Sequence, residues 1–261
     1  MAARTSSTSD ADAAFAALLA RARDDEAVLG FWLGGSRSKG RATVHSDYDC
    51  GLVVADANVD AWRSRVASAP TGMIDAAVFT LADFAEYAAW EGPQAWDRYS
   101  FVGVRALIDR TGDIQALIDA KGRIPDDGVA AFVDASIDRF INQTYRALKC
   151  LRDGDDLASR LESAQAPDAF LDALFALAGG RLRPFPKYLA WELNERPLAN
   201  SPWSAVELLA LLDMALGPAP VASLQAMLRG LEPVARQAGH GKVFDAWGAA
   251  HAWMKTWSSS A

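Results

Sequence analysis

The hydrophobic pattern of this chain of 261 residues changes near residue 124, and this change limits the fold more than any other feature. Before it, short apolar runs rich in β-branched and aromatic residues alternate with segments of helical periodicity. After it, apolar residues recur at helical spacing and no run is typical of a strand. We therefore expect an α+β chain with two domains, residues 1–123 and residues 124–261.

The same patterns predict individual elements in each domain. The small, polar residues 1–10 predict no regular structure. In the first domain we expect strands at 28–33, 48–54, 73–80 and 101–109, with helices at 11–23 and 58–67. In the second domain we expect helices at 129–151, 156–179, 185–195, 202–216, 219–238 and 242–257. The first domain should hold a sheet with flanking helices, and the second a helical bundle.

Charge and composition exclude several classes of function. The chain has 26 Lys and Arg against 33 Asp and Glu, which gives a net charge of −7. Such a chain lacks the positive charge with which proteins grip nucleic acids, so a nucleic-acid partner is disfavoured. Cys50 and Cys150 have neither metal-ligand spacing nor the density of a disulfide framework, so we expect a reducing, cytoplasmic setting. No apolar run is long enough for a membrane span.

Residues 31–56 (FWLGGSRSKGRATVHSDYDCGLVVAD) carry the pattern that points to chemistry. An apolar strand ends in Gly-Gly-Ser at 34–36, and Asp-Tyr-Asp at 47–49 opens the next strand. Because side chains alternate along a strand, Asp47 and Asp49 share one face. Neighbouring carboxylates repel unless a cation lies between them, and Mg²⁺ takes one or two carboxylates together with substrate phosphates. The pattern therefore predicts a metal–phosphate site.

Two better-known phosphate motifs do not fit this segment. A P-loop needs Gly-Lys followed directly by Ser or Thr, whereas Lys39 is followed by Gly40. The glycines at 34, 35 and 40 do not have the spacing of a dinucleotide-binding fingerprint.

The segment does resemble the signature of the polymerase-beta-type nucleotidyltransferase superfamily. The similarity is to its small-molecule branch, which includes aminoglycoside and lincosamide adenylyltransferases. Residues 33–36 and 47–49 match that signature in order and spacing. The family carries a third carboxylate on a later strand, and the similar run MIDAAVF nominates Asp75. Asp83 and Glu86 lie nearby and remain alternatives for this third position.

The resemblance implies both a fold and a reaction. The fold is a nucleotidyltransferase-type mixed sheet with flanking helices, followed by a helical domain. In the reaction, a hydroxyl attacks the α-phosphorus of a nucleoside triphosphate and pyrophosphate leaves. The expected function is transfer of a nucleoside monophosphate, with AMP from ATP as the first choice, to a small molecule such as an antibiotic. Which triphosphate and which acceptor are used stays open.

The resemblance also implies roles for individual residues. Asp47, Asp49 and Asp75 would be catalytic and would hold one or two Mg²⁺ ions, with Asp75 as general base, metal ligand or both. The residues expected to bind the nucleotide are Gly35, Ser36, Arg37, Lys39, Ser46, Lys149 and Lys187. The sequence also allows a purely structural role for Lys187, in which its aliphatic stem lies on an apolar surface.

A different class of function stays open within the same superfamily. The chain could be a nucleotide-binding antitoxin or regulator, or a catalytically inactive member. The length and the large helical domain argue against a regulator, and the set of three aspartates argues against an inactive member.

Overall fold

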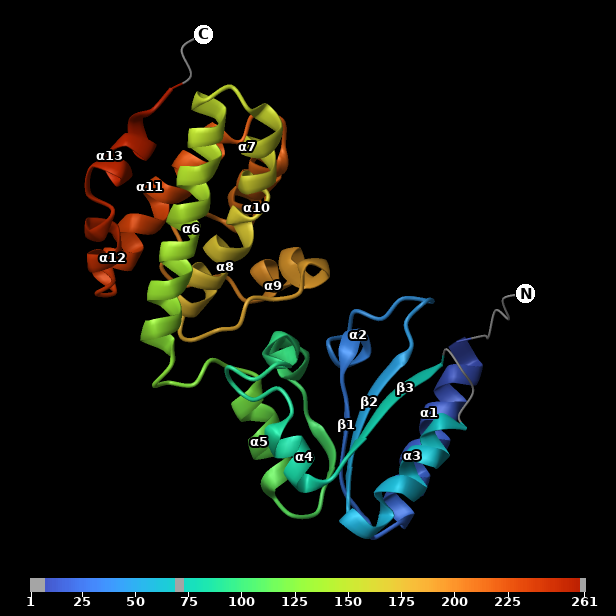
Figure 1. The fold of residues 1–261 in the computed structure, drawn as a ribbon. Coiled ribbons are helices and arrows are strands. Elements are labelled where there is room, and N and C mark those ends of the chain that lie inside the picture. Colours follow the sequence, from blue (N-terminus) through green and yellow to red (C-terminus); the bar gives the residue numbers. More distant parts are fainter. Residues whose placement is uncertain (1–7, 69–72, 259–261) are drawn as a thin grey trace. The chain divides into compact units, whose positions relative to one another are not determined.

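The computed structural model describes residues 8–68 and 73–258 (Figure 1). The chain divides into two compact units, Met1–Arg123 and Ile124–Ala261. This division falls at the position where the hydrophobic pattern of the sequence changes. The first unit combines a mixed sheet with helices and the described part of the second is helical, so the fold class is α+β.

A four-stranded sheet organises the first unit, in the order β3-β2-β1-β4. Its strands are β1 (Val28–Leu33), β2 (Tyr48–Val54), β3 (Ile74–Phe79) and β4 (Ala106–Asp109). β1 runs antiparallel to β2 and to β4, whereas β2 and β3 are parallel. As a result, β1 ends on the side of the sheet where β2 and β3 begin, and this line of strand ends is called the edge of the sheet below (Figure 1). The short helix α2 (Gly35–Ser38) follows β1 directly at that edge.

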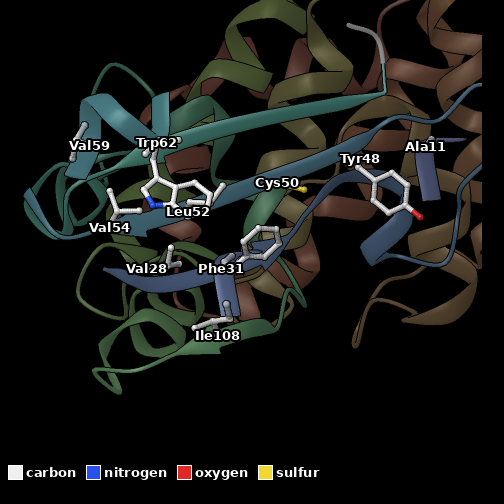
Figure 2. Packing of buried hydrophobic residues seen from close by; sticks show 12 residues of the cluster. Ala11, Val28, Phe31, Tyr48, Cys50, Leu52, Val54, Val59, Trp62 and Ile108 are labelled. Atoms are coloured by element: carbon white, nitrogen blue, oxygen red, sulfur yellow. The ribbon is translucent and has the colours of Figure 1, made fainter. Parts of the chain in front are cut away.

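Helices cover both faces of this sheet. One face packs against α1 (Thr8–Asp24) and α3 (Val59–Ala67), which follows the short η1 (Asp56–Asn58). Figure 2 shows this cluster, whose strand residues include Phe31, Tyr48, Cys50, Leu52 and Val54. The other face packs against α4 (Leu81–Glu86), η2 (Ala95–Phe101) and α5 (Asp113–Lys121). Because alternate residues of β2 point to opposite faces, Asp49 lies on the face of this second group.

The second unit is built around one long helix, α6 (Val129–Arg152). Its other elements are α7 (Asp156–Ser163), α8 (Ala166–Leu177), η3 (Pro186–Tyr188), α9 (Leu189–Glu195), α10 (Ala205–Leu216), α11 (Val221–Gln237), α12 (Gly241–Ala246) and α13 (Gly248–Thr256). The apolar stripe of α6 is buried, and the ring of Phe140 lies 5.3 Å from that of Phe170 on α8. This stripe is the one that the sequence pattern predicted.

Several predicted elements differ from the observed ones. The strand expected at 101–109 is only Ala106–Asp109, because Phe101 belongs to η2 and Gly103 turns the chain with φ +73°. The helix expected at 156–179 is interrupted, because Pro167 cannot donate a backbone hydrogen bond and opens α8. The helix expected at 242–257 is divided at Gly248, where φ is +47°. Two helices, α4 and α5, were not placed by the sequence pattern. The expectation for residues 1–10 lies largely outside the described residues, and α1 begins at Thr8.

The packing of Phe140 gives a stability prediction. Phe140→Ala removes a fully buried ring and is expected to lower the free energy of unfolding by about 3–5 kcal/mol. Leu161→Ala, at a leucine of α7 that is 60% exposed, should change it by no more than about 0.5 kcal/mol. Urea titration followed by circular dichroism measures both. Equal effects would contradict the core assignment.

Candidate functional site

The edge of the sheet where β2 and β3 begin brings two of the nominated aspartates together. Asp49 of β2 and Asp75 of β3 are direct partners in the parallel register. Both point to the face of the sheet opposite Tyr48 and Cys50. The N–H of Gly34, at the end of β1, donates to the carbonyl of Asp49 at 2.7 Å. The end of β1 is therefore held against the start of β2, which places the Gly-Gly-Ser segment beside these carboxylates.

The three aspartates differ in exposure. Asp49 is half-buried, while Asp47 and Asp75 are exposed. Asp75 is exposed although its neighbours in the sequence are apolar. β3 is the outermost strand of the sheet, and its face carrying Asp75 and Ala77 is open to solvent at this end. Solvent access removes the desolvation cost and leaves the carboxylate of Asp75 available to a small molecule.

The three nominated aspartates all lie close enough to Cys50 to act on its thiol. Burial, and after it the negative charges of Asp49, Asp75 and Asp47 in that order of importance, together raise the pKa of Cys50 to about 12. Cys50 lies on the opposite face of β2, so these charges act on it across the strand. A single buried group therefore senses all three aspartates.

Gly35 adjoins Asp49 so closely that no side chain fits there. A Cβ atom on Gly35 would overlap Oδ2 of Asp49, and Gly35 also has a left-handed backbone with φ +60°. Glycine is the residue that adopts this conformation without strain. Because Gly35 has no side chain, the carboxylate of Asp49 can occupy this space.

The nominated serines link α2 to the segment before β2. The hydroxyl of Ser36 donates to Oγ of Ser46 at 3.0 Å, and Ser46 Oγ accepts the N–H of Thr43 at 2.9 Å. These bonds bring the two ends of the spacer together. Ser36 and Ser46 are thus neighbours at the site, and their role toward a nucleotide remains a prediction.

The nominated cations of the first unit have protein partners. Nε of Arg37 donates to the carbonyl of Asp47 at 3.0 Å, and Nη2 donates to the carbonyl of Ser46 at 2.9 Å. Nζ of Lys39 donates to the carbonyl of Val102 at 2.8 Å and lies 4.7 Å from the ring centre of Tyr99. Both side chains therefore hold the segment around the site to the rest of the unit.

Lys149 and Lys187 belong to the second unit. Lys149 is an exposed residue of α6, and Lys187 lies in η3, with Nζ 4.9 Å from the ring centre of Tyr188. This contact gives the charged end of Lys187 a partner in its own unit. Their part in nucleotide binding stays a prediction.

The alternatives to Asp75 lie elsewhere. Asp83 and Glu86 are on α4, which follows the far end of β3. Asp83 also lies 3.9 Å from Nη2 of Arg63, measured from its Oδ2 atom. Asp75 is therefore the residue that the register places beside Asp49.

The carboxylates at this site provide some of the oxygen ligands that a hard cation such as Mg²⁺ needs. Among residues 8–68 and 73–258, no group of three or more His, Cys, Asp or Glu side chains is arranged to hold a metal ion. Mg²⁺ needs only one or two carboxylates when substrate phosphates supply further oxygens. Asp49 and Asp75, side by side on neighbouring strands, fit that smaller set. Asp47, at the exposed start of the segment, remains a predicted third ligand.

Sequence reasoning missed one residue near this site, Asp12 of α1. Its Oδ1 atom accepts a hydrogen bond from the hydroxyl of Tyr48 at 2.7 Å and lies 3.5 Å from Nη1 of Arg37. Asp12 lies in an Ala-rich helical pattern that carries no sign of this contact.

The helical unit has a pocket of its own between α9 and α10. It has a volume of about 220 Å³, and its lining includes Leu193, Asn194, Leu198, Trp203 and Leu208. None of the nominated residues lines it, and its walls carry no charged side chain. The edge of the sheet remains the better candidate for chemistry on a phosphate. Across the described ranges, the structure also contains no helix with the length and apolarity to cross a membrane.

Comparisons with family models and with curated proteins found no match. What the site does must therefore be inferred from its residues and their geometry.

The contact between Gly35 and Asp49 predicts a specific sensitivity. Gly35→Ala should lower the free energy of unfolding by about 1–3 kcal/mol more than Gly40→Ala. Both glycines have a left-handed backbone, but a Cβ atom on Gly40 meets nothing within 4 Å. The matched pair separates backbone strain from overlap with Asp49, and chemical denaturation measures it. Equal losses would mean that Asp49 moves aside at no cost.

The position of Cys50 predicts an ordered change in thiol reactivity. In a Cys150→Ser background, Asp49→Asn should accelerate alkylation of Cys50 at mildly alkaline pH. Removing a negative charge lowers the pKa of the thiol and so raises the thiolate fraction.

Asp75→Asn and then Asp47→Asn should act in the same direction with smaller effects. Asp60→Asn on α3, whose side chain is fully exposed, is the control. A pH series of alkylation rates, read by mass spectrometry, tests the order. No change with any of the three would contradict the clustering.

Proposed function

We propose that the protein is a metal-dependent nucleotidyltransferase that moves a nucleoside monophosphate, AMP from ATP in the first instance, onto a hydroxyl of a small molecule. The observation that carries the proposal is the register pair of Asp49 and Asp75 beside Gly35. This pair gives a half-buried and an exposed carboxylate, side by side, next to a Gly-Gly-Ser segment. The resemblance of residues 31–56 and 73–79 to the nucleotidyltransferase signature supports the same function and a nucleotidyltransferase-type sheet.

In this proposal the aspartates have different roles. Asp49 and Asp75, with Asp47 as a further ligand, hold Mg²⁺. When bound, the ion neutralises negative charge that develops on the phosphate oxygens. The exposed carboxylate of Asp75 accepts the proton of the acceptor hydroxyl. The acceptor oxygen then forms a bond to the α-phosphorus, the bond to the β-phosphate oxygen breaks, and pyrophosphate leaves.

The remaining residues shape the site. Gly35 keeps the space beside Asp49 free of a side chain. The hydroxyls of Ser36 and Ser46 lie together at the segment that would face the phosphates. An antibiotic of the aminoglycoside or lincosamide type is one acceptor consistent with the resemblance.

A second candidate function is nucleotide binding without transfer, as in an antitoxin, a regulator or an inactive member of the superfamily. One observation favours it: within the described ranges, the three carboxylates do not form a ready metal-holding group. Under this reading the chain binds a nucleotide and leaves it unchanged.

A transfer assay tests the proposal. The protein is incubated with Mg²⁺, α-labelled nucleoside triphosphates and a panel of aminoglycosides and lincosamides. We expect a labelled small-molecule product. Asp49→Asn and Asp75→Asn should each lower its rate by at least about a hundredfold, because each removes a charged group that acts on the reacting atoms.

Asp60→Asn, an exposed aspartate of the same unit, should leave the rate unchanged. Calorimetry with the same triphosphates separates the candidates. Nucleotide binding with no labelled product would favour the regulator. If the protein neither binds a nucleotide nor forms a labelled product, both candidate functions are overturned.

A further inference from the structure

Arg37 donates two hydrogen bonds to the main chain that leads into β2. Its Nε and Nη2 atoms donate to two successive carbonyls, those of Asp47 and Ser46, at 3.0 and 2.9 Å. The side chain is only 14% exposed. The planar fork of a guanidinium matches such a pair of acceptors, whereas the amine of a lysine acts as a point charge. A phosphate would have to displace a carbonyl to reach either of these two hydrogens, and Nη1 lies 3.5 Å from Oδ1 of Asp12.

The first helix supports Arg37 from the other side. The guanidinium carbon lies 3.8 Å from the ring centre of Tyr48, which is a stacking distance. The hydroxyl of Tyr48 donates to Asp12 at 2.7 Å, and the same oxygen of Asp12 lies 3.5 Å from Nη1 of Arg37. Phe15 of α1 stacks on Tyr48 with ring centres 4.3 Å apart. Arg37 is therefore held between α1 and the segment 41–47.

We infer that Arg37 is a positioning residue, supported by Asp12 and Tyr48, that fixes the main chain at Ser46 and Asp47. The bond to the carbonyl of Asp47 holds the main chain directly before β2, which begins at Tyr48. Asp49 is the second residue of β2, so its place opposite Asp75 depends on how the chain enters the strand. This replaces the expected role of Arg37 as a phosphate ligand. The consequence for catalysis rests on the proposed function, whereas the consequence for the segment does not.

Limited proteolysis tests the inference without a transfer assay. Arg41 is an exposed trypsin site in the segment that Arg37 holds. Arg37→Gln removes two charge-assisted hydrogen bonds, so cleavage after Arg41 should become about tenfold faster or more. Arg65→Gln is the matched control, because Arg65 also lies over an aromatic ring, Trp62, at 4.5 Å and pairs with Asp25 at 3.7 Å. Mass spectrometry of the fragments should show an unchanged rate for the control.

Kinetics then separate the two roles of Arg37. As a positioning residue, Arg37→Lys should lower kcat about as much as Arg37→Gln and raise the Mg²⁺ concentration needed for half-maximal rate. The KM for the nucleotide should stay the same. A phosphate ligand would behave differently, because Arg37→Lys keeps the charge and would rescue part of a raised KM.

Asp12→Asn adds an independent check. This residue points at Arg37 and Tyr48, and we expect the same kind of kcat loss with a smaller size. A raised nucleotide KM in Arg37→Gln together with an unchanged cleavage rate would overturn the inference. If the wild-type protein shows no transfer, the proposed function fails, and the cleavage rate after Arg41 still decides whether Arg37 fixes the segment.

Discussion

The parallel pairing of β2 with β3 is the constraint on which the rest of the site depends. In that register Asp49 faces Asp75, and Cys50 faces Ala76 on the opposite side of the sheet. A slip of one residue would turn Asp75 toward the face covered by α1 and α3. There its carboxylate would enter an apolar cluster that includes Cys50 and Trp62. The cost of burying an unpaired charge therefore selects the register that brings the two aspartates together.

The parts of the fold that the sequence predicted well are those with strong local signals. β1 and β2 are apolar runs between glycines and polar residues, and α6 carries a long stripe of apolar residues at helical spacing. The parts that differ depend on contacts between distant residues. Arg98 is an example, since an arginine in a polar segment gives no sign that it will be buried. It donates to the carbonyls of Ala88, Ala120 and Arg123, and these contacts fix η2 against α4 and α5.

The same division applies to the site. The alternation of a strand predicted one face for Asp47 and Asp49, and the family resemblance nominated Asp75. The register places Asp75 beside Asp49, while its role stays a prediction. The exposure of Asp75 could not be predicted, because it depends on β3 being the outermost strand of the sheet. The cations were harder still. The partner of Lys39, the carbonyl of Val102, lies 63 residues further along the chain, and Asp12 lies 25 residues before Arg37.

The fit between Gly35 and Asp49 has a consequence for how such a sequence can diverge. The space for a Cβ atom at position 35 is already filled by the carboxylate at position 49. The two positions are well separated along the chain, yet a side chain at position 35 cannot be introduced without moving the carboxylate at position 49. Across related chains they should covary as one unit, with any side chain at position 35 accompanied by a smaller residue at position 49.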